Sequence, residues 1–124
     1  MTTRFNDLEN GSSVLTLLGF SSSVSCTLHY QRVGKSVSLT FGAFTGTKAV
    51  AGAISVSSGS IASRYCPPEN SFFPVSISID GVRRTAVIWV LSNGAVALYG
   101  DASGAQIANG ATVSVDNMSI SFVL

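Results

Sequence analysis

The chain has 124 residues, with seven Lys and Arg, six Asp and Glu, and a formal net charge of +1. This length fits one domain, and the scattered basic residues argue against a nucleic-acid interface, which needs clustered Lys and Arg to bind phosphates. Hydrophobic residues make up 46% of the chain, so a folded core is expected rather than disorder.

The first thirteen residues differ from the rest of the chain. We expect residues 1–13 to form a flexible tether and residues 14–124 to form one folded domain. The start lacks a basic stretch followed by an apolar run, so no secretion signal is predicted. No apolar run approaches the roughly 18 residues that cross a bilayer, so no membrane insertion is predicted.

Apolar and polar residues alternate with a period of two along most of the chain, as in β-strands. The first predicted strands are 14–18, 24–32, 36–43 and 50–57, and the second and third of them have one apolar face and one face rich in hydroxyls. This alternation is typical of antiparallel sheet that packs on one side. Gly34 and Lys35 predict a tight turn between the second and third of these strands.

The segment 42–48 is predicted to be a loop between strands. It resembles a phosphate-binding loop only superficially, because Thr47 and Lys48 stand in the wrong order and no helix follows to supply N-terminal amides. The hydroxyl-rich, glycine-containing stretch therefore predicts no nucleotide site.

Residues 72–99 predict a three-stranded meander with turns at Asp80-Gly81 and Asn93-Gly94, dipeptides that favour two-residue hairpins. A last strand is expected within 111–124. About eight short strands with regular turns favour an all-β fold, an antiparallel β-sandwich of the jelly-roll type.

The run 85–91 is apolar on both faces, so it needs a second cover besides the core, from a loop or another copy of the chain. Few charges also leave sheet edges poorly protected against association. Both features favour a homo-oligomer that buries neutral Ser-rich and apolar faces. Within the run, Trp89 is expected in the core, with an interface position as the alternative.

Cys26 and Cys66 are the only cysteines, too few for a disulfide framework or a structural zinc site. A bridge between them is possible, and two buried free thiols are favoured. His29 is the single histidine, and no Gly-x-Ser-x-Gly motif accompanies it. The acidic residues are dispersed, and the segment 100–104 has too few carboxylates for calcium. We therefore predict no enzyme, no metal and no cofactor.

The segment IASRYCPPENSFFPVSISIDGV, from Ile61 to Val82, resembles C-terminal domains of phage tail fibres and related viral fibre or spike proteins. The hairpin Tyr30 to Phe41 and the closing stretch Ser119 to Leu124 resemble segments of the same family. Similar small knobs also occur on adenovirus fibres. Together the resemblance covers about residues 24–124.

The resemblance implies a compact homotrimeric head, similar to the tumour-necrosis-factor/C1q jelly roll, at the tip of a virion fibre. Such a head attaches to a glycan or protein receptor on the host-cell surface, and the resemblance brings no catalytic residues. Position in loops suggests the receptor-binding candidates Lys48, Arg64, Tyr65, Glu69, Asn70, Asp101 and Gln106. The candidates for the trimer interface are Trp89, Tyr99 and Arg83.

Three alternatives remain open at this point. The first is a virion decoration or assembly domain without receptor binding. The second is a small carbohydrate-active enzyme with two acids across one cleft, and the third is a secreted lectin unrelated to viruses.

Overall fold

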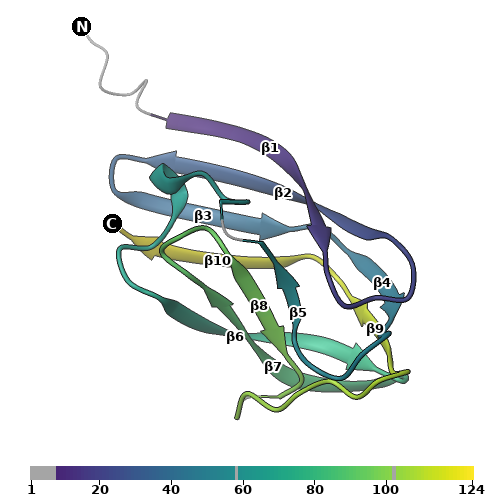
Figure 1. Cartoon of the computed structure of the whole chain (residues 1–124). Helices are drawn as coiled ribbons and strands as arrows, with labels where there is room; N and C mark the ends of the chain where they lie inside the picture. Colours follow the sequence, from purple (N-terminus) through teal and green to yellow (C-terminus); the bar gives the residue numbers. More distant parts are fainter. Residues whose placement is uncertain (1–7, 58, 102) are drawn as a thin grey trace, which may run out of the picture.

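The computed structural model describes residues 8–57, 59–101 and 103–124, which form ten β-strands in two antiparallel sheets (Figure 1). This confirms the predicted all-β class. The order in the four-stranded sheet, sheet A, is β1-β2-β3-β10, and the order in the six-stranded sheet, sheet B, is β4-β9-β6-β7-β8-β5. No helix within these described ranges is long and apolar enough to cross a membrane.

The strands are short, and most match an alternating segment of the sequence. Sheet A consists of β1 (Leu8–Leu17), β2 (Val24–Val33), β3 (Ser36–Phe41) and β10 (Met118–Val123). Sheet B consists of β4 (Phe44–Thr47), β5 (Ile54–Val56), β6 (Ser71–Ile79), β7 (Val82–Val90), β8 (Val96–Tyr99) and β9 (Thr112–Val115). One turn of 3-10 helix, η2 (Ser63–Tyr65), precedes β6.

Strand β1 begins well before the predicted domain boundary. It pairs with β2 along its whole length, starting with Leu8 opposite Val33. Residues 8–13 therefore belong to sheet A, which corrects the predicted tether 1–13, and residues 1–7 of that segment lie outside the described residues. The backbone of β2 supplies hydrogen-bond partners to this polar stretch, an effect that local composition does not reveal.

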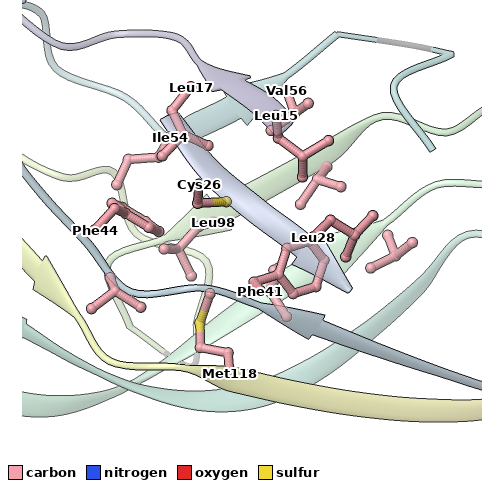
Figure 2. Close-up of a cluster of buried hydrophobic side chains, with 14 of the residues drawn as sticks. Leu15, Leu17, Cys26, Leu28, Phe41, Phe44, Ile54, Val56, Leu98 and Met118 are labelled. Atoms are coloured by element: carbon pink, nitrogen blue, oxygen red, sulfur yellow. The ribbon is translucent and has the colours of Figure 1, made fainter. Parts of the chain in front are cut away.

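A single hydrophobic core lies between the two sheets. Along β2, Cys26 and Leu28 are buried while Thr27 and His29 are exposed, as the alternation predicts. Figure 2 shows the side chains of both sheets meeting in this core. Its labelled members are Leu15, Leu17, Cys26, Leu28, Phe41, Phe44, Ile54, Val56, Leu98 and Met118.

The meander β6-β7-β8 is present as predicted, but its two turns differ. Asp80 and Gly81 both have positive φ, 51° and 81°, which identifies the predicted two-residue turn of type I′. At the second turn, the N–H of Leu91 donates to the carbonyl of Ala95 at 2.9 Å. This closes a three-residue loop with Gly94 at positive φ, so the prediction of a two-residue turn at Asn93-Gly94 is wrong.

The predicted loop 42–48 contains a strand. Strand β4 pairs with β9 over four residues, from Phe44 opposite Val115 to Thr47 opposite Thr112. Local sequence gives little signal for so short a strand, because its partner lies more than sixty residues later in the chain.

The predicted last strand, 111–124, is two strands in different sheets. Strand β9 lies in sheet B and β10 in sheet A, and Asp116 and Asn117 form the corner between them. The amide oxygen of Asn117 accepts a 3.0 Å hydrogen bond from the N–H of Ala43, which ties this corner to the chain between β3 and β4. Splitting this segment and adding β4 explain why the described strands number ten rather than about eight.

Candidate functional site

The outer side of sheet B carries an apolar cluster, here called the aromatic face, formed by Phe72, Pro74, Val87, Trp89 and Tyr99. Cross-strand pairing sets Phe72 opposite Trp89 and sets Val87 between Pro74 and Tyr99. The Phe72 and Trp89 rings lie 5.3 Å apart with an interplanar angle of 31°, within the range of attractive aromatic pairs. Phe72 is nevertheless 62% exposed, so this pair presents an apolar surface to water.

The doubly apolar run 85–91 explains how this face arises. Its inward residues Ala86, Ile88 and Val90 belong to the core. On the outward side Val87 is buried by the chain's own neighbouring segments, while Trp89 is only half-buried. The outward side of the run 85–91 is therefore only partly covered by the chain itself. The prediction that Trp89 packs in the core is wrong, because the strand register places Trp89 on the outer side of sheet B.

A tight turn after β8 borders the aromatic face. Ser103 and Gly104 line a hollow of about 220 Å³ together with Phe72, Val87 and Trp89. The Oδ1 atom of Asp101 accepts hydrogen bonds from the hydroxyl of Ser103 at 2.6 Å and from its N–H at 2.8 Å. These bonds, the hydroxyl above all, hold the pKa of Asp101 below its usual value, and they fix the turn beside the rings.

The three predicted interface residues lie on the same side of sheet B. Trp89 and Tyr99 belong to the aromatic face, and Arg83 lies further along the outer side of β7, opposite Ser78. Its guanidinium donates to the Ser76 hydroxyl and to the Asp116 carboxylate, each at 3.3 Å. The structure thus brings these candidates onto one surface, where Arg83 lies at the polar margin.

Lys48, a predicted receptor contact, is buried, which corrects that prediction. Its side chain is 2% exposed, and its Nζ donates to the carbonyl of Ala53 at 3.1 Å. The ammonium lies 5.9 Å from the centre of the Phe20 ring, and burial lowers the pKa of Lys48. An isolated antiparallel β-bridge pairs Lys48 with Phe20, and the buried Lys48 side chain is not accessible to a receptor.

Arg64 and Tyr65 act within the fold. Tyr65 is 8% exposed, so its prediction as a surface contact is wrong, and its hydroxyl donates to the Glu9 carboxylate at 2.9 Å. Arg64 is exposed and forms an ion pair with the same carboxylate. The Tyr65 ring also packs on Tyr30, with ring centres 4.3 Å apart, so η2 covers one end of the inner side of sheet A.

The remaining receptor candidates are exposed but lie in separate loops. Glu69 and Asn70 precede β6, and the Asn70 amide oxygen accepts a 2.9 Å hydrogen bond from the N–H of Ser92. Gln106 lies beside Ile107, which bridges to Gly52. Their contact with a receptor stays a prediction.

The outer side of sheet A, here called the hydroxyl face, joins the hydroxyl-rich faces that the sequence predicts for single strands, but the sequence did not identify it as a binding site. Its side chains form two rows of polar groups, without Lys, Arg, Asp or Glu, that cross four strands. One row is Ser12, His29, Thr40 and Ser119, and the other is Asn10, Gln31, Ser38 and Ser121. The period-two alternation placed these residues on one side of their strands, but only the strand register aligns them.

Both cysteines are free and buried, as favoured by the sequence, and burial raises the pKa of each thiol. Among the described residues, no three His, Cys, Asp or Glu side chains gather where they would hold a metal ion. No protein family model matches the chain, and no curated protein matches its sequence.

Proposed function

We propose that the chain is a non-enzymatic attachment head of the viral fibre type, a jelly-roll-like sandwich at a virion fibre tip. Three copies associate through the aromatic face and bind a glycan or protein receptor on a host cell. The observation that carries the proposal is the Phe72–Trp89 pair, in which a large exposed ring stacks on the half-buried indole. In a lone copy this apolar surface stays in contact with water, at a cost in free energy.

The composition of this surface supports association between copies. Protein interfaces are enriched in Trp, Tyr, Phe and Arg, with the aromatic residues near the centre and polar groups at the rim. Phe72, Trp89 and Tyr99 provide such a centre, and Arg83 with its partner Asp116 provides a polar margin. Repeated copies would also allow weak receptor contacts to add up, because each further contact forms at a high effective concentration.

The oligomeric state tests this proposal. Sedimentation of the wild type should give three times the 12.8 kDa mass of one chain, and Phe72→Ser with Trp89→Ser should give single copies that keep the β-sheet circular dichroism. Val82→Ser is the matched control, since it removes an apolar side chain that is 58% exposed on the same strand as Trp89. A wild type that remains a single copy at its highest soluble concentration would contradict the proposal.

Attachment is tested on the trimer itself. Fluorescently labelled trimer should bind at least one cell type in a panel of bacterial and animal cells, and unlabelled trimer should compete with it. A well-folded trimer that binds none of these cells would instead support the assembly domain without receptor binding.

A further inference from the structure

We infer that the hydroxyl face binds an uncharged saccharide. The inference rests on the attachment function proposed above and gives its ligand a chemical class. It locates the ligand on the outer side of sheet A rather than in the loops favoured by the sequence.

Strand register creates the site. Ser12 pairs with His29, and His29 with Thr40, while Asn10, Gln31 and Ser38 form the parallel row two residues away. Neighbouring strands lie about 4.8 Å apart, and alternate residues on one strand about 7 Å apart. These six side chains, here called the grid, line a hollow of about 400 Å³ on the outer side of sheet A. This volume is within the range of ligand sites.

The lining groups match the hydrogen bonding of sugar hydroxyls. Hydroxyl and amide side chains each donate and accept hydrogen bonds, and a sugar hydroxyl does both. Amides such as those of Asn10 and Gln31 offer a donor and an acceptor side by side, so each can engage two adjacent hydroxyls of one ring. At the margin of the grid, the hydroxyls of Thr40 and Ser119 lie 3.0 Å apart, so side chains of one row on neighbouring strands reach hydrogen-bonding distance.

Charge selects among saccharides. None of the residues that line the hollow is Lys, Arg, Asp or Glu. The nearby charged residues of β1 and β2, Glu9 and Arg32, are engaged elsewhere: Glu9 with Arg64, and Arg32 with the carbonyl oxygens of Gly34 and Arg64. A sialylated, sulfated or phosphorylated sugar would lose hydration here without gaining a counter-charge, so the face favours neutral ligands.

An apolar row next to the polar rows completes the match. Leu8 lies opposite Val33, and Ser36 joins Val33 to Val123 across the sheet. Leu8, Val33 and Val123 are 46%, 52% and 68% exposed. A pyranose presents C–H groups as well as hydroxyls, and its C–H groups can pack against this row while its hydroxyls face the grid.

The same features disfavour a second copy of the chain as the occupant. Burying the grid against another protein surface would require partners for all its hydroxyl and amide groups, and each group left unpaired costs free energy. The aromatic face offers association without that cost. The hydroxyl face therefore stays open to the ligand in the proposed trimer.

The test compares two amide side chains in different places. Gln31 lies in the grid and Asn109 in an exposed turn, and Gln31→Glu and Asn109→Asp introduce the same charge. Purified wild-type protein is applied to immobilised neutral glycans and to their sialylated and sulfated counterparts. Titration with free glucose, galactose and N-acetylglucosamine is followed by amide NMR shifts.

We expect the wild type to bind neutral glycans and to show amide shifts in β1, β2 and β3. Gln31→Glu should weaken binding at least about tenfold, with an unchanged sedimentation coefficient, whereas Asn109→Asp should bind as the wild type. Loss of binding in Asn109→Asp alone, preference for acidic glycans, or dissociation of the oligomer by Gln31→Glu would each overturn the inference.

The two proposals fail in different ways. One outcome is that labelled trimer binds cells in a way that neither competing neutral glycans nor the Gln31→Glu substitution changes. In that case the saccharide site is wrong and attachment stands. If no cell is bound while free sugars shift amides around Gln31, the saccharide site stands and attachment is wrong.

Discussion

The hydroxyl of Tyr65 donates a 2.9 Å hydrogen bond to Oε1 of Glu9, a residue 56 positions earlier in the chain. The other carboxylate oxygen, Oε2, pairs with the guanidinium of Arg64. Glu9 lies in β1, an edge strand of sheet A, and Tyr65 lies in η2. One carboxylate thus fastens the start of the edge strand to the segment that covers the end of the core.

Removing the Tyr65 hydroxyl should weaken this connection. We expect Tyr65→Phe to lower the free energy of unfolding by about 1 kcal/mol, the usual contribution of one hydrogen bond, because the ring and its packing on Tyr30 remain. Urea denaturation measures the change. Tyr99→Phe, which removes the same group from the outer side of sheet B, is the control, and an equal loss in both variants would argue against a specific role for Glu9.

The same pair predicts a decline at alkaline pH. Burial, together with the hydrogen bond to Glu9, raises the pKa of Tyr65 above its usual 10.0. The folded state therefore holds this proton more tightly than the unfolded state, and the stabilisation present below pH 10.0 is lost as the pH rises through the folded-state pKa. Denaturation curves at increasing pH should show this loss in the wild type and a smaller one in Tyr65→Phe.

Lys48 predicts a trend of the opposite sign. Burial lowers the pKa of Lys48 below its usual 10.5, so the unfolded state binds this proton more tightly, and the contribution of Lys48 to stability improves as the pH rises toward 10.5. The stability of the wild type relative to Lys48→Met should therefore increase from neutral pH to 10.5. A constant difference between the wild type and Lys48→Met across this range would refute the prediction.

Gly11 is required by the ring of Tyr30. A Cβ atom at position 11 would lie 2.6 Å from the Tyr30 hydroxyl oxygen and 2.8 Å from Cζ, so the ring must move from its contact with Tyr65. We expect Gly11→Ala to lower the free energy of unfolding by about 1–3 kcal/mol, as overpacking does. Thermal denaturation checks this, with Ser12→Ala on the opposite side of β1 as the control that should change little.

Asp101 should control the turn beside the aromatic face. Its Oδ1 accepts bonds from Ser103 and from the N–H of Ala105, so Asp101→Ala should speed hydrogen exchange at the Ser103 and Ala105 amides while leaving β7 and β8 protected. Because the Ser103 hydroxyl above all lowers the pKa of Asp101, the wild-type turn should persist at neutral pH and loosen only as the pH falls below 3.8. Protection of these amides in Asp101→Ala would contradict this role.

The cysteines should react only after unfolding. Cys26 and Cys66 are buried, and burial raises the pKa of both thiols, which lowers the amount of reactive thiolate. A disulfide-forming thiol reagent should label the native protein slowly and both cysteines rapidly in denaturant. Denatured, unreduced protein that yields no thiol would instead reveal a bridge between them.

Strands with strong local patterns were predictable. The alternation around Cys26 and Leu28 and the turn at Asp80-Gly81 depend on a few adjacent residues, so β2 and the first hairpin of the meander follow from them. Strand β4 and the division between β9 and β10 were missed, since pairing with distant segments decides them. For the same reason the prediction of a tether is wrong for residues 8–13, which form a strand because they pair with β2.

The alternation of apolar and polar residues predicts an all-β protein with apolar inner and hydroxyl-rich outer sides, because side chains alternate across any extended strand. The fold sets which outward residues meet, with Gln31 beside Asn10 and Ser38, and Phe72 against Trp89. It also placed Lys48 inside and Trp89 outside. Strand register and loop packing depend on contacts between remote parts of the chain, and no local pattern contains that information.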